Sequence, residues 1–184
     1  MLATALLTVN VPAQGSDRVS QGDAEAVLHA FGTGGLAIIH HLPVGTGAPA
    51  DSELRASIRP FSGSPWDGRH FCAEDWHVLL IAEIAGGDSS YHMQDAMAEL
   101  NPGVVQLFLD GMSLPSTRTS IKRFLSPERF QLVNAFYFQQ GAILAPSALT
   151  VGSHTAKYIA TDPTGIDSDQ ITFFVDAPNS GACV

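Results

Sequence analysis

The second half of the chain alternates apolar and polar residues with a period of two, which predicts β-strands. The alternation is clearest over residues 153–161 and 170–176. The residues expected on one face are His154, Ala156, Tyr158 and Ala160 in the first strand, and Ile171, Phe173 and Val175 in the second. Further strands are expected over residues 36–42, 54–61, 76–85, 104–110, 117–124 and 134–144. The segment 76–85 is almost continuously apolar, as is typical of a buried central strand.

Two segments instead have the 3.6-residue period of an amphipathic helix. In residues 20–31 the apolar stripe consists of Ala24, Val27, Leu28 and Phe31, and in residues 89–100 of Met93, Ala96, Met97 and Leu100. The sequence Asn101-Pro102-Gly103 ends the second helix. Short strands separated by turn signals favour an antiparallel β-sandwich over a parallel βαβ sheet, so we expect a mainly β fold with two short helices at its end or side.

Residues 14–184 are expected to form a single sandwich domain with an elaborated N-terminal part. Residues 1–13 have two interpretations. The apolar run from Leu2 to Val11, followed by the small-residue pattern Val11-Pro12-Ala13, resembles the back half of a secretory signal without its basic region. The same residues also fit a plain first strand.

Composition supports a folded domain and disfavours two classes of partner. Apolar residues make up 45% of the 184 residues and charged residues 15%, against about 25% in a typical soluble domain. The net charge is −9 and the basic residues are scattered. We therefore expect neither a nucleic acid nor an anionic membrane surface as partner. No apolar run approaches the ~20 residues that span a bilayer.

Three stretches together resemble the bacterial Ig-like domains of secreted and surface proteins. They are LFLDG at 107–111, LTVGSHTAKYIATDPTG at 149–165 and ITFFVD at 171–176, so the resemblance covers roughly residues 104–177. It implies an Ig-like sandwich that serves as an extracellular or periplasmic binding or spacer module, usually without enzymatic activity. His154, which follows Gly152, is interpreted as a corner residue that bonds to the backbone, as a tyrosine does in immunoglobulin-like folds.

The chain has two cysteines, Cys72 and Cys183. In an exported protein a disulfide between them would tie the C-terminal tail to the middle of the chain. In a cytosolic protein they would be two unpaired thiols, and the sequence leaves both states open.

The densest group of chemically active side chains consists of His70, Cys72, Asp75 and His77. A carboxylate that orients an imidazole, next to a cysteine nucleophile, would suit a small metal-dependent or Cys/His enzyme. A buried histidine at the start of an apolar strand and a disulfide cysteine explain the same residues without catalysis.

Asp162, Asp167 and Asp169 crowd the polar segment between the last two strands. We expect no cofactor here, with Ca²⁺ as the alternative: carboxylate oxygens on a loop suit Ca²⁺, although this loop supplies fewer than the 6–8 ligands calcium takes. A solvated hairpin turn is the alternative interpretation.

The function favoured by these observations is an exported, non-catalytic binding, adhesion or structural module. Recognition is expected through loops such as residues 62–68 and 162–169, with Trp66 as an aromatic contact and a carbohydrate or a surface protein as partner. The alternatives are the enzyme just described and a self-assembling surface or filament subunit that pairs through exposed strands.

Overall fold

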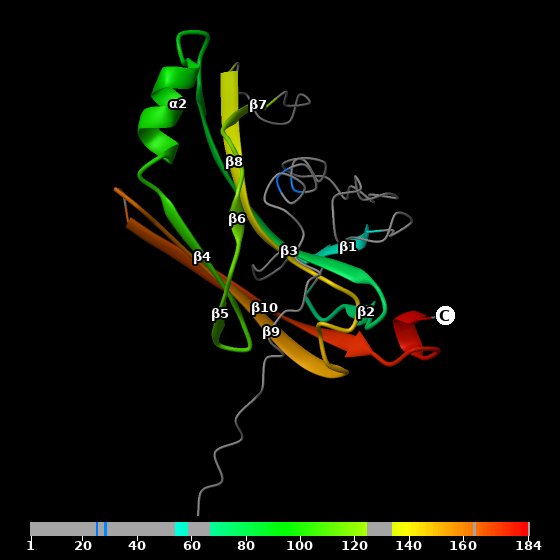
Figure 1. Ribbon diagram of the computed structural model, residues 1–184. Coiled ribbons are helices and arrows are strands. Elements are labelled where there is room, and N and C mark those ends of the chain that lie inside the picture. The colour runs from blue at the N-terminus through cyan, green and yellow to red at the C-terminus, as the bar shows by residue number, and fades with distance from the viewer. Residues whose placement is uncertain are drawn as a thin grey trace, which may run out of the picture.

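A computed structural model describes Glu25, Leu28, the backbone of residues 54–58, and residues 67–124, 134–163 and 165–183. This part of the chain is mainly β and forms two five-stranded sheets (Figure 1). None of the helices it contains is long and apolar enough to cross a membrane. The predicted strand over residues 36–42 lies outside the described residues, as does most of the predicted helix over residues 20–31.

The first sheet, sheet A, is built on two long antiparallel strands. Its order is β1 (Leu54–Ile58), β3 (Trp76–Gly87), β8 (Asn134–Leu144) and β6 (Thr117–Arg118), and β7 (Lys122–Phe124) also pairs with β8. Strand β1 runs parallel to β3, whereas the other pairs are antiparallel. The predicted strand over 117–124 is therefore two short strands, and both pair with β8.

The second sheet, sheet B, contains the two strands with the clearest alternation. Its order is β2 (His70–Cys72), β10 (Gly165–Asp176), β9 (Gly152–Asp162), β4 (Val104–Leu109) and β5 (Met112–Leu114). Strand β2 runs parallel to β10, and the remaining pairs are antiparallel. The predicted alternation is confirmed, because His154, Ala156 and Tyr158 are buried on β9. On β10 the buried residues are Ile171, Phe173 and Val175.

The two sheets share one hydrophobic core. Sheet A contributes Leu79, Ala85, Phe138, Ala142 and Leu144, and sheet B contributes Phe71, Val105, Leu107, Ala156, Tyr158, Ile171, Phe173 and Val175. The inward faces of the two sheets therefore pack against each other, which is the arrangement expected of a sandwich.

Sheet A is buried on its other face as well. Val78, Leu79 and Leu80 are consecutive on β3, so their side chains alternate between the two faces, yet all three are buried. On the outer face Leu28 packs against Gly141 of β8, where a Cβ would collide with it. The prediction of a buried central strand over 76–85 is thus confirmed.

The helix predicted over 89–100 begins later, as α2 (Met93–Leu100). His92 is its N-cap, and its backbone N–H donates to Oδ2 of Asp95 at 2.7 Å. Of the predicted apolar stripe, Ala96 and Leu100 are buried, whereas Met93 and Met97 are partly exposed. Glu25 and Leu28, the described residues of the other predicted helix, are helical.

Arg118 joins α2 to both sheets. Its guanidinium donates to the carbonyl oxygens of Leu100 (2.7 Å) and Gly103 (2.5 Å), at the end of α2 and just before β4. The same group lies 3.6 Å over the ring centre of Phe138 on β8. One half-buried cation therefore satisfies carbonyls at the helix C-terminus, which attracts positive charge.

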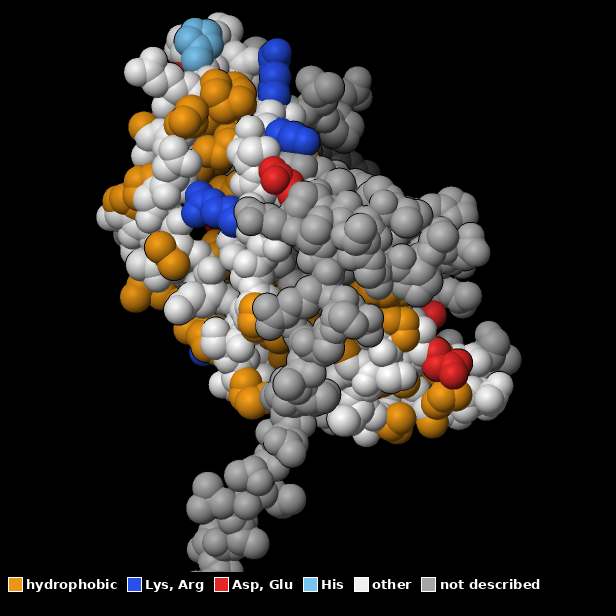
Figure 2. Space-filling view, in the orientation of Figure 1, with side chains coloured by type: hydrophobic (Ala, Val, Ile, Leu, Met, Phe, Trp, Pro, Cys, Tyr) orange, Lys and Arg blue, Asp and Glu red, His pale blue; other side chains and the backbone are white. Residues whose placement is uncertain are grey.

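Apolar side chains reach the surface in separate patches (Figure 2). The large apolar residues exposed among the described ones are Ile84, Met93, Met97, Val104, Met112, Val151 and Ile166. The described surface therefore combines single apolar side chains with polar ones, as is ordinary for a folded domain.

Candidate functional site

The tight turn between β4 and β5 places a carboxylate at the end of sheet B. Its two residues, Asp110 and Gly111, both have positive φ, 50° and 78°. This geometry is typical of the two-residue turns that join the strands of a β-hairpin, and Asp-Gly is a favoured pair for such turns. The backbone N–H of Asp110 donates to the Thr155 carbonyl at 2.8 Å, and the Thr155 N–H donates to Oδ1 of Asp110 at 2.8 Å. The turn is therefore fastened to β9.

A buried histidine holds the other oxygen of this carboxylate. Nδ1 of His154 lies 2.8 Å from Oδ2 of Asp110, and Nε2 lies 2.7 Å from the Thr150 carbonyl oxygen. Both neighbours are hydrogen-bond acceptors, so the ring satisfies both contacts when both of its nitrogens carry a proton. The His154 side chain is 7% exposed and that of Asp110 is 43% exposed. The pair thus presents its carboxylate to solvent and keeps its imidazole inside.

His154 is also packed against the core. Its ring stacks on Phe173 with the centroids 5.5 Å apart. The corner interpretation of this residue is confirmed in its bond to the backbone, although the carbonyl belongs to Thr150, just before β9, rather than to a segment across the sandwich.

The Asp110 carboxylate borders a groove of about 460 Å³ on sheet B. The other side chains that line this groove are Phe108, Thr155, Lys157, Ile159 and Gln170. We call it the Asp110 groove. It lies on the solvent face, because the intervening residues of the same strands, such as Leu107, Ala156 and Ile171, are buried in the core.

The register of three strands places the groove side chains next to one another. Lys157 on β9 is opposite Phe108 on β4 and opposite Gln170 on β10. Cross-strand neighbours on one face of a sheet have Cβ atoms about 5 Å apart. The side chains of Lys157 and Gln170 make no hydrogen bond or ion pair within the described part of the chain. Their polar groups are therefore available to a ligand.

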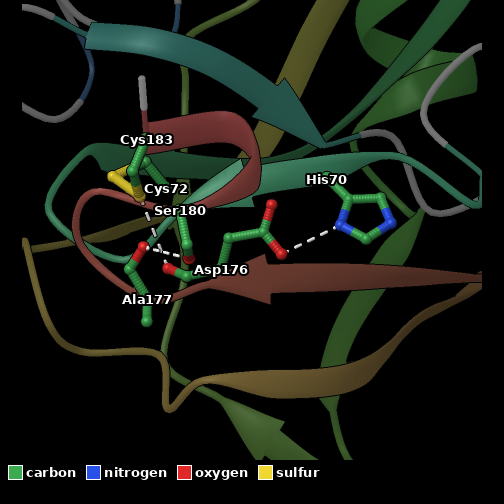
Figure 3. Close-up of a disulfide and its surroundings, with 6 residues drawn as sticks. All are labelled: His70, Cys72, Asp176, Ala177, Ser180 and Cys183. Carbon is green, nitrogen blue, oxygen red and sulfur yellow. Dashed lines mark hydrogen bonds and ion pairs between the residues drawn. A yellow bond between two sulfur atoms is a disulfide. The ribbon is translucent and has the colours of Figure 1, made fainter.

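A second histidine–aspartate pair lies at the edge of sheet B, next to a disulfide (Figure 3). Nδ1 of His70 is 2.9 Å from Oδ1 of Asp176, and the His70 ring stacks on Phe174 with the centroids 4.8 Å apart. Here the imidazole is the exposed partner, at 56%, and the carboxylate is 18% exposed. The nearby Ser180 hydroxyl donates to the Ala177 carbonyl at 2.7 Å, so it is engaged with the backbone.

The disulfide joins Cys72 on β2 to Cys183 in the 3₁₀ helix η1 (Gly181–Cys183), with an S–S distance of 2.09 Å. Of the two states that the sequence left open, the bonded one is therefore present. The bond links residues 111 positions apart and fixes the C-terminal segment to the edge of sheet B (Figure 3). The cysteine nucleophile of the predicted enzyme is consequently absent while this bond is intact.

The remaining residues of the predicted catalytic cluster are not brought into one site. His70 is exposed beside β10, and Asp75 lies in the turn before β3, where its N–H donates to the Cys72 carbonyl at 3.1 Å. His77 is 0% exposed, and neither of its ring nitrogens has a hydrogen-bond partner among the residues that the structure describes. The pKa of His77 is lowered to about 4, chiefly by desolvation; the Cys72 backbone raises it, and the nearby His154 contributes a smaller lowering. His77 is therefore a neutral core residue.

The predicted acidic loop is a strand hairpin. Strand β9 extends to Asp162 and β10 begins at Gly165, so the expectation of a loop over residues 162–169 is wrong and the hairpin alternative holds. Each of the three carboxylates accepts a hydrogen bond, Asp162 from the Gly165 N–H (3.0 Å), Asp167 from the Tyr158 hydroxyl (2.6 Å) and Asp169 from the Gln170 N–H (2.7 Å). Among the described residues no group of three or more His, Cys, Asp or Glu side chains is arranged to hold a metal ion.

Glu83 on β3 faces this hairpin from the other sheet. Burial raises the pKa of its carboxyl, and the charges of Asp167 and Asp162 raise it further, while Arg118 lowers it. The carboxylates of Glu83, Asp162 and Asp167 thus repel one another across the two sheets.

Trp66 lies outside the described residues. The described end of its loop is bonded to β10, because the Gly68 N–H donates to the Thr172 carbonyl at 2.7 Å and the Thr172 N–H donates to Oδ1 of Asp67 at 2.9 Å. Thr172 lies about 23 Å along β10 from Gly165, at 3.3 Å per residue. The described end of the 62–68 loop therefore lies far from the tip of the hairpin at Gly165.

Sequence reasoning did not find the Asp110 groove. Part of the signal was present, since the alternation of β9 places Thr155, Lys157 and Ile159 on the outward face and Asp110-Gly111 is a turn pair. The neighbours of those residues on β4 and β10 depend on strand order and register, which the sequence pattern does not specify.

No protein-family model matches the chain, and no curated protein matches it. The chemistry of the groove and of the two histidine–aspartate pairs is therefore the basis for a functional proposal.

Proposed function

We propose that this chain is an exported, non-catalytic binding module with an Ig-like sandwich fold, and that its ligand occupies the Asp110 groove. The observation that carries the proposal is the way Asp110 is held. Two hydrogen bonds, from His154 and from the Thr155 backbone, fix a carboxylate that is 43% exposed. A polar group fixed before binding loses little conformational entropy when a ligand arrives, and this raises affinity.

The chemistry around Asp110 favours binding over catalysis. The imidazole that contacts its carboxylate is buried, and its second nitrogen is engaged with the Thr150 carbonyl. This ring would have to break a hydrogen bond before it could exchange a proton with a ligand. No cysteine or serine lines the groove, and the Thr155 hydroxyl has no imidazole partner among the described residues. A nucleophile activated by a base is what covalent catalysis requires.

Export is supported by the disulfide. Structural disulfides persist in oxidising compartments and are rare where glutathione keeps thiols reduced. The excess of acidic over basic residues is compatible with an exposed extracellular or periplasmic surface.

The test is a binding screen of the oxidised full chain. We expect at least one ligand from a panel of oligosaccharides, peptides and small metabolites to raise the melting temperature of the wild type. The same ligand should fail to do so for the Phe108→Ala and Lys157→Ala variants. The matched control is Gln106→Ala, which alters an exposed residue of β4 outside the groove. Stabilisation that is unchanged in both groove variants would overturn the proposal.

A further inference from the structure

We infer that the Asp110 groove binds an uncharged saccharide, an inference that rests on the proposed function and names the ligand class. The first reason is the balance of charge in the groove. Its two charged side chains, Asp110 and Lys157, have opposite signs and form no ion pair with each other. A cationic ligand would meet the Lys157 ammonium, and an anionic one would meet both Asp110 and a chain of net charge −9.

The second reason is the hydrogen-bonding capacity of the lining. The Asp110 carboxylate only accepts, the Lys157 ammonium only donates, and the Gln170 amide does both. A ligand with several hydroxyl groups can satisfy all three, because each hydroxyl is both a donor and an acceptor. Buried polar groups left without partners would cost affinity, so a ligand that lacks hydroxyls is disfavoured.

The third reason is the apolar floor. Phe108 is half-buried and lies directly opposite Lys157, with Ile159 two residues further along β9. An aromatic ring on the face of a sheet offers a flat apolar surface next to polar groups, and the C–H face of a sugar ring has the same combination.

The position of the groove disfavours an extended peptide. A peptide that adds a strand to a sheet needs an edge with unpaired backbone N–H and C=O groups. The groove instead lies over β10, β9 and β4, which are consecutive in sheet B and hydrogen-bonded to one another. These three strands therefore present side chains rather than unpaired backbone groups to the ligand, and side-chain recognition suits a saccharide.

The experiment is a glycan array followed by calorimetric titration of the oxidised full chain. The neutral probes are oligomers of glucose, mannose, xylose and N-acetylglucosamine, and the charged probe is oligogalacturonate. A neutral oligomer is expected to bind. Phe108→Ala should weaken it about tenfold or more, as expected for loss of an aromatic anchor. Gln170→Ala should weaken it about two- to tenfold, which corresponds to one hydrogen bond.

Matched controls separate the groove from the rest of the sheet. Gln106→Ala removes the same type of side chain as Gln170→Ala, from another strand and outside the groove, and should leave the affinity unchanged. Gln170 and Lys157 lie on the solvent face, so their alanine variants should fold even if Phe108→Ala does not.

The outcomes distinguish this inference from the proposed function. If only the charged oligogalacturonate or a peptide binds, and Lys157→Ala abolishes that binding, the inference of an uncharged saccharide fails. The proposed binding module still stands in that case. If a neutral oligomer binds equally well to Phe108→Ala, Lys157→Ala and Gln170→Ala, the groove is not its site and the inference is overturned. If no neutral oligomer binds, the inference is likewise overturned, and the thermal screen with other ligands then decides the proposed function.

Discussion

Two histidine–aspartate pairs at the same end of sheet B are arranged in opposite ways. His154 stacks on Phe173 inside the sandwich, whereas His70 stacks on Phe174 outside it. The two phenylalanines are consecutive on β10, so their side chains necessarily point to opposite faces. In each pair Nδ1 lies less than 3 Å from a carboxylate oxygen, but the inner pair exposes its carboxylate and the outer pair exposes its imidazole.

The two pairs contain the same two side-chain types, and burial determines which of them can contact a ligand. The imidazole of His154 is buried and does not line the groove. It can affect a ligand only by positioning the Asp110 carboxylate, which does line the groove. The outer imidazole can reach solvent, but its neighbourhood is tied to η1 by the disulfide and contains no free hydroxyl from Ser180. We therefore propose that recognition takes place at the inner pair, and we attribute the stability of the outer region to the disulfide rather than to its histidine–aspartate pair.

The largest expected effect comes from the disulfide beside the outer pair. Replacing both Cys72 and Cys183 by serine should lower the free energy of unfolding by about 4 kcal/mol, because the bond closes a loop of more than 100 residues in the unfolded chain. Denaturant unfolding of the variant and the oxidised wild type measures this. Equal stability of the two proteins would mean that the outer region is not held by the bond.

The next largest expected effect is the pH dependence of the free energy of unfolding that arises from the buried His77. His77 has a folded-state pKa of about 4, below the ordinary value of 6.5, so the unfolded chain takes up its proton first as the pH falls. Its contribution to stability is complete above pH 6.5 and is lost between pH 6.5 and pH 4, by about 3 kcal/mol.

The matched variant for this prediction is His77→Leu, which removes the titrating group. Because neither ring nitrogen has a partner within the described part of the chain, the variant should be at least as stable as the wild type at pH 5. The measurement is the pH dependence of the free energy of unfolding of both proteins. Identical slopes between pH 6.5 and pH 4 would show that His77 is not a neutral core residue.

A smaller loss is expected from the inner pair. His154→Phe should lower the free energy of unfolding by about 2 kcal/mol, because the Thr150 carbonyl loses its buried donor while the contact with Phe173 is kept. The variant should also weaken ligand binding at the Asp110 groove, although His154 does not line it. Denaturant unfolding and titration with the same ligand measure the two effects, and unchanged affinity would contradict a positioning role.

The smallest effect is expected from the exposed histidine. His70→Ala should change the free energy of unfolding by less than about 1 kcal/mol, as is usual for an ion pair open to solvent. Ligand affinity should not change. A loss of stability as large as that of His154→Phe would remove the distinction between the two pairs.

The sequence pattern predicted the strands whose two faces differ. Ser153 to Thr161 alternates because one face meets the core, and the same holds from Gln170 to Asp176. The start of β10 was missed because Gly165 to Ser168 is exposed on both faces, Ile166 included, so the period of two is lost where the hairpin extends into solvent. The start of α2 was placed too early because Ser90 bonds to Asp88 in a local turn that competes with the helix.

The candidate site was less accessible to sequence reasoning. The Cys72–Cys183 bond could be proposed because the chain has only two cysteines. The groove depends on Phe108, Lys157 and Gln170 becoming neighbours, and these residues come from three strands far apart in the sequence. Strand order and register create that contact, and neither is encoded in a local pattern.

The central claim is that ligand recognition takes place at the Asp110 groove, and an NMR titration tests it most directly. Backbone amide shifts of the oxidised full chain would be followed while the neutral oligosaccharides are added. We expect changes concentrated around Phe108, Asp110, Lys157 and Gln170, with little change at His70 and Asp176. Changes concentrated instead around His70 and the disulfide, with the groove amides unmoved, would contradict it.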